Sequence, residues 1–169
     1  MELNETAPDF ELSDLENRPH RLSALRGRMV VVNFWSCECP QSERTDPLLK
    51  ELTSENEDSP LLLSVASNRN ESPEAISRVA HDRGLPTVLL DPDHEVADLY
   101  GALTTPHVFV IDEGGILRYR GAIDDVTFRQ RRASRFYLRE ALDALRHGGR
   151  PAVPETPAYG CTIVRHTLE

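Results

Sequence analysis

The chain has 169 residues, 39% hydrophobic and 28% charged, which suffices for one domain with a sizeable core, alone or followed by a tail. Its 28 acidic residues outnumber its 19 basic ones, and the resulting net charge of −9 argues against nucleic acid or an anionic membrane as partner. With three cysteines and no visible export signal, we expect a cytoplasmic, reducing location, where a disulfide is catalytic rather than structural.

Apolar patterning predicts strands that alternate with helices. The valine-rich run 29–35 is apolar on both faces, as in a strand at the centre of a sheet. Pro40 and Ser72-Pro73 mark helix starts, and Pro47 should kink the first of these helices. The expected elements are a hairpin over 9–22, strand 29–35, helix 40–56, strand 61–66, helix 73–83, strand 87–90, helix 96–100, hairpin 107–119 and helix 138–145. This order indicates an α/β domain with a mixed sheet.

The last segment of the chain differs from the rest. Residues 148–159 contain three prolines and no apolar periodicity, so we expect an extended tail over the surface. The tail ends in the strand-like sequence G-C-T-I-V-R, which carries the third cysteine.

The stretch F-W-S-C-E-C-P-Q-S holds the other two cysteines, Cys37 and Cys39. Cys39 is placed at the end of the central strand and directly before the helix that Pro40 opens. The N–H groups and the dipole at a helix N-terminus favour a thiolate, which is the nucleophilic form, although Glu38 and Glu43 oppose this effect. The alternative is a packed, inert thiol. The position favours a reactive Cys39.

Several longer segments resemble one family. They are A-P-D-F-E-L-S-D-L-E-N (7–17), L-S-A-L-R-G (22–27), V-V-V-N-F-W (30–35), T-T-P-H-V-F-V-I-D-E-G-G (104–115), Y-R-G-A-I-D-D (119–125), Y-L-R-E-A-L-D-A-L (137–145) and P-E-T-P-A-Y-G-C-T-I (154–163). Together they are similar to redoxin proteins, the thioredoxin-fold group that includes alkyl hydroperoxide reductase/thiol-specific antioxidant proteins and membrane-anchored disulfide reductases. The tail resembles a peroxiredoxin-like branch that ends in G-C-x-I.

This resemblance implies a thioredoxin fold with a mixed central sheet, helices on both faces and an N-terminal hairpin. It implies a redoxin domain over 1–147 and a tail over 148–169 that packs on the same domain. By resemblance, Cys39 is the reactive cysteine and Pro106 is a cis-proline. Thr105, Pro106 and Trp35 then shape a substrate groove.

The chain also departs from the family patterns. Thioredoxins have a second cysteine where this chain has Ser42. Full peroxiredoxins use P-x-x-x-T-x-x-C, in which Ser36 matches the threonine but Val32 stands at the proline. The arginine that activates peroxide in peroxiredoxins has four candidates here that the sequence does not rank: Arg118, Arg120, Arg129 and Arg135.

The partner of Cys39 remains open at this point. Cys161 is either the resolving cysteine or a small residue that anchors the tail. Cys37 is either a second redox partner or a bystander, because a disulfide across a single residue strains the usual geometry. Cys37, Cys39 and His107 together could also suit a soft metal ion such as copper(I).

These observations predict a thiol-dependent oxidoreductase in which Cys39 attacks a disulfide or a peroxide and Cys161 or an external thiol resolves the intermediate. Ser36 and Ser42 are expected to hydrogen-bond the reacting sulfur or its oxygen. The expected partners are an external thiol reductant such as a thioredoxin and the peroxide or disulfide substrate, with no cofactor. The alternatives are a copper-handling thioredoxin-fold protein and a redox-fold binding module without turnover.

Overall fold

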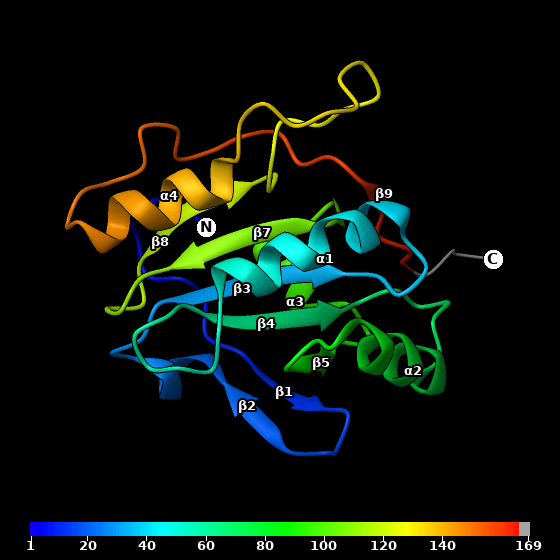
Figure 1. Ribbon diagram of the computed structural model, residues 1–169. Coiled ribbons are helices and arrows are strands. Elements are labelled where there is room, and N and C mark those ends of the chain that lie inside the picture. Colours follow the sequence, from blue (N-terminus) through cyan, green and yellow to red (C-terminus); the bar gives the residue numbers. More distant parts are fainter. Residues whose placement is uncertain (166–169) are drawn as a thin grey trace.

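The computed structural model describes residues 1–165, which form one central sheet covered by helices (Figure 1). The strands are β1 Glu11–Asp14, β2 Pro19–Arg21, β3 Val30–Trp35, β4 Leu61–Ala66, β5 Val88–Leu90, β6 Thr104–Thr105, β7 His107–Ile111, β8 Leu117–Gly121 and β9 Cys161–Thr162. The helices are the 3-10 helix η1 Leu22–Leu25, α1 Pro40–Leu52, α2 Pro73–Arg83, α3 Glu95–Tyr100 and α4 Tyr137–Arg146.

The main sheet has the strand order β2-β1-β5-β4-β3-β7-β8. Strands β3, β4 and β5 are parallel, whereas β1 and β7 join them in antiparallel pairs. The mixed sheet and the N-terminal β1–β2 hairpin confirm the predicted thioredoxin-type architecture. Strand β3 lies between β4 and β7, so its carboxyl end, where Cys39 follows, is at the centre of the sheet edge.

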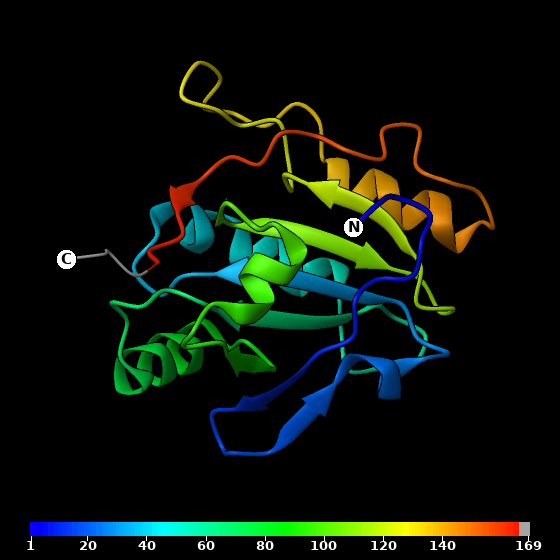
Figure 2. The ribbon, with the colours of Figure 1, turned by 180° about the vertical axis from the view of Figure 1, so that it is seen from behind.

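Side chains of β3 alternate between two cores, as strand geometry requires. Val30, Val32 and Phe34 join the cluster that packs against α3. Val31 belongs to the cluster beneath α1 and α4, and Trp35 packs with residues of α2. Helices α1, α2 and α4 therefore cover one face (Figure 1), and α3 covers the other (Figure 2). Helices on both faces were predicted, and this prediction is confirmed.

Helix α1 begins with Pro40 and continues through Pro47 to Leu52, four residues short of the expected end at 56. The chain becomes extended at Thr53, whose hydroxyl donates a 2.6 Å hydrogen bond to the Leu49 carbonyl. A threonine side chain that bonds the preceding turn competes with helix continuation, which accounts for the earlier end.

The tail returns along the outer edge of β8 and then crosses to the end of the sheet that holds Cys39 (Figure 2). Main-chain hydrogen bonds of 3.1 Å join the Arg120 N–H to Pro154 and the Thr156 N–H to Arg120. Gly121 permits this approach, because a Cβ there would lie 2.2 Å from the Thr156 Oγ1. The segment ends in β9, which pairs antiparallel with β6. The predicted tail extends to residue 169, and its residues 166–169 lie outside the described part of the chain.

Within residues 1–165, none of the helices combines the length and apolar character that crossing a membrane requires.

Candidate redox site

Cys39 is the N-cap residue of α1, with extended backbone angles (φ −86°, ψ 120°). The apolar β3 strand brings the chain to the sheet edge, and Pro40 then starts the helix with its fixed φ. The side chain of Cys39 is 2% exposed, and its Sγ lies 3.1 Å from the Thr105 carbonyl oxygen. The Thr105–Pro106 peptide bond is cis, as the resemblance implied. The structure therefore places Cys39, Thr105 and Pro106 together at one corner.

Cys39 forms a disulfide with Cys161, across a Cα–Cα distance of 6.1 Å and a sequence separation of 122 residues. In the β6–β9 pair, Cys161 lies opposite Thr105, so the tail strand runs beside the cis-proline. Gly160 makes this close approach possible, because a Cβ at that position would lie 2.0 Å from the Thr105 oxygen. Cys161 was considered either as the partner of Cys39 or as an anchor of the tail, and the structure shows it bonded to Cys39. The residue before it must be a glycine for the tail to approach Thr105 this closely.

The two residues Ile163 and Val164 anchor the tail by packing and by hydrogen bonds. The Ile163 side chain is buried in the main core, and its N–H donates to the Leu103 carbonyl at 3.1 Å. The Val164 N–H donates a 2.6 Å hydrogen bond to the Asn68 side-chain Oδ1, and the Val164 carbonyl accepts a 2.9 Å hydrogen bond from the Arg69 N–H. These contacts anchor the tail strand beside the disulfide, so anchoring and disulfide formation are not exclusive.

A buried carboxylate, Glu71, organises the loop that precedes Cys39. It accepts hydrogen bonds from the Ser36 hydroxyl at 2.6 Å, from the Cys37 N–H at 2.8 Å and from the Asn68 side-chain amide at 2.6 Å. Because Asn68 also binds the tail at Val164, one side chain connects the docked tail to the redox loop.

Ser36 and Ser42 have partners other than the reacting sulfur. The Ser36 hydroxyl donates to Glu71 and accepts from the Glu38 N–H at 3.2 Å, and the Ser42 hydroxyl accepts from the Ser36 N–H at 3.3 Å. In this disulfide state neither hydroxyl has the Cys39 sulfur among these partners, and a hydrogen bond to the reacting sulfur or its oxygen stays a prediction. Both side chains instead fix the backbone of the loop.

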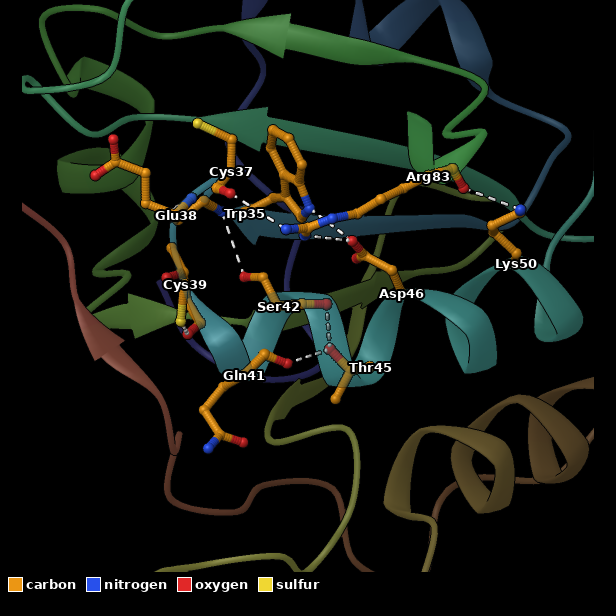
Figure 3. A network of polar contacts seen from close by, with 12 residues as sticks. Trp35, Cys37, Glu38, Cys39, Gln41, Ser42, Thr45, Asp46, Lys50 and Arg83 are labelled. Carbon is orange, nitrogen blue, oxygen red and sulfur yellow. Dashed lines mark hydrogen bonds and ion pairs between the residues drawn. The ribbon is translucent and has the colours of Figure 1, made fainter. Parts of the chain in front are cut away.

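Trp35 is fully buried, which corrects its predicted place in a substrate groove. Its indole N–H donates a 2.9 Å hydrogen bond to Asp46 on α1, and the Arg83 guanidinium bonds the same carboxylate oxygen at 3.0 Å. Arg83 also donates to the Cys37 carbonyl at 3.2 Å (Figure 3). Burial raises the pKa of Asp46, against the lowering effect of Trp35 and Arg83. This cluster connects the redox loop to both α1 and α2.

Cys37 is a free, buried thiol. Burial raises its pKa to about 12, and the Glu71 carboxylate adds to this effect, so the group stays protonated at neutral pH. Figure 3 shows the Cys37 and Cys39 side chains on opposite sides of the loop. The geometry thus favours a packed bystander over a partner of Cys39.

The three residues considered as an alternative metal site do not form one. Cys39 is in the disulfide, and the His107 Nδ1 accepts a hydrogen bond from the Leu103 N–H at 3.3 Å. Burial, together with the nearby Arg120 charge, lowers the pKa of His107 to about 4. Across residues 1–165, no group of three or more histidine, cysteine or acidic side chains is arranged to hold a metal ion.

The four arginines considered for peroxide activation have hydrogen bonds or ring contacts with residues other than Cys39. Arg118 binds Asp112, Arg120 binds Glu155 and the Met1 carbonyl, Arg129 lies over the Phe128 ring, and Arg135 binds Glu140.

Sequence reasoning missed Glu71, Asn68, Asp46 and Arg83. Asn68 and Glu71 follow the carboxyl end of β4, which is parallel to β3, and such strand ends meet at one edge of a sheet. The polar run S-N-R-N-E after that strand was the available signal. Asp46 could have been sought as the acceptor that a buried indole N–H needs.

Comparison with known proteins agrees with this geometry. Thiol-disulfide oxidoreductase ResA from Geobacillus thermodenitrificans is 36% identical over 111 residues, which cover 65% of this chain and 63% of that protein. ResA from Halalkalibacterium halodurans is 33% identical over 112 residues, covering 66% of this chain and 63% of that protein. The chain therefore spans less than two thirds of the length of these relatives.

Solved structures extend the likeness to the tail. An uncharacterized conserved protein from Geobacillus kaustophilus superimposes with a TM-score of 0.88 and 27% identity, covering 99% of this chain and 94% of that one. The thioredoxin domain of a Bacteroides vulgatus thiol-disulfide oxidoreductase, at 20% identity and a TM-score of 0.62, covers 78% of this chain and 93% of its own, and supports the fold. The model of the AhpC/TSA family matches residues 3–120, and the chain belongs to this family.

Proposed function

We propose that this chain is a thiol-disulfide oxidoreductase whose redox pair is Cys39 and Cys161. The observation that carries the proposal is their disulfide at the N-terminus of α1, beside the cis Thr105–Pro106 bond. Membership of the AhpC/TSA family and the naming of its relatives as thiol-disulfide oxidoreductases support the same reaction.

Reduction of the substrate takes two exchange steps, and recycling of the protein follows them. In the reduced protein, the Cys39 thiolate attacks a substrate disulfide, forms a mixed disulfide and releases one substrate thiolate. Cys161 then loses its proton, and its thiolate attacks the Cys39 sulfur. This step restores the Cys39–Cys161 disulfide and releases the second substrate thiol. An external dithiol, such as a thioredoxin, returns the pair to its reduced form and becomes a disulfide itself.

The surrounding residues assist these steps by position and charge. The free N–H groups that follow Pro40 in the first turn of α1, together with the helix dipole, favour negative charge on Cys39. Ser42 stands where thioredoxins carry their second cysteine, so in this chain the tail supplies the second thiol. Glu71 and Ser36 hold the loop backbone that carries Cys39.

A peroxide is the second substrate class that the family membership suggests, with antioxidant activity as its consequence. In that reaction the Cys39 thiolate takes one peroxide oxygen to give a sulfenic acid and, with a proton, an alcohol or water. Cys161 would then condense with the sulfenic acid and release water. The contacts of the four candidate arginines are with residues other than Cys39, which favours the disulfide as substrate. A cytoplasmic location accords with this chemistry, and cell fractionation tests it.

Turnover of a model disulfide by defined cysteine variants tests the function. We expect the reduced protein to reduce the substrate with thioredoxin as recycling reductant, and we expect Cys39→Ser to abolish turnover. Cys161→Ser should stop at the mixed disulfide, visible as a mass adduct on Cys39. Cys37→Ser is the matched control and should keep the wild-type rate. Full turnover by either Cys39→Ser or Cys161→Ser would refute the proposal.

A further inference from the structure

We infer that an external thiol reduces the disulfide by attacking the Cys161 sulfur, so that Cys39 is the leaving thiolate. This inference rests on the proposed function and assigns a different role to each sulfur. Cys39 receives the substrate, whereas Cys161 receives the reductant. The mixed disulfide with the reductant therefore forms on the tail and not at the helix N-terminus.

Access to the two sulfurs differs. Exchange requires the attacking thiolate to reach one sulfur from the side opposite the other. Cys39 is 2% exposed, and the Thr105 carbonyl oxygen lies 3.1 Å from its Sγ. Cys161 is partly exposed and lies on a two-residue strand at the surface. A protein thiol thus reaches Cys161 more readily than Cys39.

The two possible leaving groups also differ. Exchange is faster when the departing thiolate is the more stable one. Cys39 occupies the N-cap of the 13-residue helix α1, where the N–H groups and the helix dipole stabilise an anion. The carboxylates of Glu38, next to Cys39, and of Glu43, in the first turn of α1, oppose this effect, but both residues are exposed and their charges are screened by solvent. Cys161 has no helix terminus in its own strand, so it is the poorer leaving group.

The docked tail keeps Cys161 in place during the attack. Ile163, Val164 and Arg165 hold the chain beyond the cysteine, and Arg165 donates to both the Asp98 carboxylate at 2.7 Å and the Ala102 carbonyl at 2.6 Å. The sulfur that the reductant attacks is therefore presented on an anchored strand.

The electron balance is that of a normal exchange. The reductant thiolate forms a bond to the Cys161 sulfur as the Cys39–Cys161 bond breaks, and the electron pair leaves on Cys39. The second thiol of the reductant loses its proton and attacks its own sulfur in the mixed disulfide. Cys161 departs as a thiolate, and the reductant ends as a disulfide.

Trapping the intermediate tests this assignment. The oxidised full-length protein is mixed with an excess of a thioredoxin whose second active-site cysteine is replaced by serine. Samples are quenched in acid after increasing times, and free thiols are then alkylated. Peptide mass mapping of the earliest samples identifies the cysteine in the mixed disulfide. We expect the Cys161 adduct to exceed the Cys39 adduct at least about tenfold, with Cys39 alkylated.

The cysteine that carries the earliest adduct shows which sulfur the reductant attacks. An adduct mainly on Cys39, or equal adducts at the earliest times, overturns the assignment and leaves the proposed function standing. A parallel reaction with unaltered thioredoxin measures whether the disulfide is reduced at all. Failure of that reduction overturns the proposed function and this inference with it.

Discussion

Gly160→Ala tests how the tail brings its cysteine to the redox corner. The new Cβ would lie 2.0 Å from the Thr105 oxygen and 2.6 Å from the Thr105 carbonyl carbon, and real Cβ atoms essentially never approach closer than 3.0 Å. The tail must therefore move away by at least about 1 Å, since Thr105 is itself buried. The Cys39–Cys161 Cα distance of 6.1 Å is only about 0.7 Å below the usual limit of ~6.8 Å for a disulfide. We expect the variant to lose most of its disulfide.

Quantitative alkylation with intact-mass detection measures the oxidised fraction in a glutathione redox buffer. We expect Gly160→Ala to need at least about tenfold more oxidising conditions than the wild-type protein for half oxidation. Gly149→Ala is the matched control in the same tail, because its Cβ meets only the Ala144 oxygen at 3.4 Å. A Gly160→Ala protein that oxidises like the wild type would refute the argument from close approach.

Three further predictions concern the surroundings of the disulfide. Asn68→Ala removes the hydrogen bonds of this side chain to the Val164 N–H and to the Glu71 carboxylate, which together contribute about 1–2 kcal/mol. The disulfide should therefore be some 5- to 30-fold less favoured in glutathione buffers. The exposed Asn70→Ala is the control and should match the wild type. Cys37, whose pKa is raised to about 12 by burial, should resist alkylation at pH 8 in the folded, reduced protein and react only after denaturation; rapid labelling would contradict its assignment as a packed thiol. Burial lowers the pKa of His107 in the folded protein to about 4. As the pH falls below 6.5, this imidazole therefore binds a proton in the unfolded chain before it does so in the folded protein. Up to about 3 kcal/mol of folding stability that is present above pH 6.5 should be lost as the pH falls towards 4. Urea unfolding should show a weaker pH dependence in His107→Asn, while the exposed His81→Asn keeps the wild-type slope; equal slopes in all three proteins would contradict the burial argument.

Local sequence patterns carried the prediction of the sheet and of the Cys39 corner. The continuous run of β-branched valines at 30–32 favours a strand covered on both sides, and Pro40 directly after Cys39 marks the helix start. The N-terminal hairpin followed from alternation and a turn. These features depend on residues that are close in the sequence, so they could be predicted from the sequence alone.

The site contacts depend on the path of the chain in space. The pairing of Cys161 with Cys39 required knowing that the tail follows β8 and then pairs with β6, which no periodicity encodes. The error at Trp35 has the same origin, since a position beside the reactive loop does not reveal which side of the sheet the ring occupies. The role of Glu71 required the juxtaposition of two parallel strand ends.

Cys39 and Cys161 are expected to form a reversible redox pair. The most direct measurement is an equilibrium titration of the full-length protein in glutathione buffers, with peptide mapping of the disulfide at each point. We predict one two-electron transition that interconverts the Cys39–Cys161 disulfide and two free thiols, with Cys37 unchanged throughout. A disulfide that stays closed across all the buffers, or a transition that links Cys37 instead, would contradict the account.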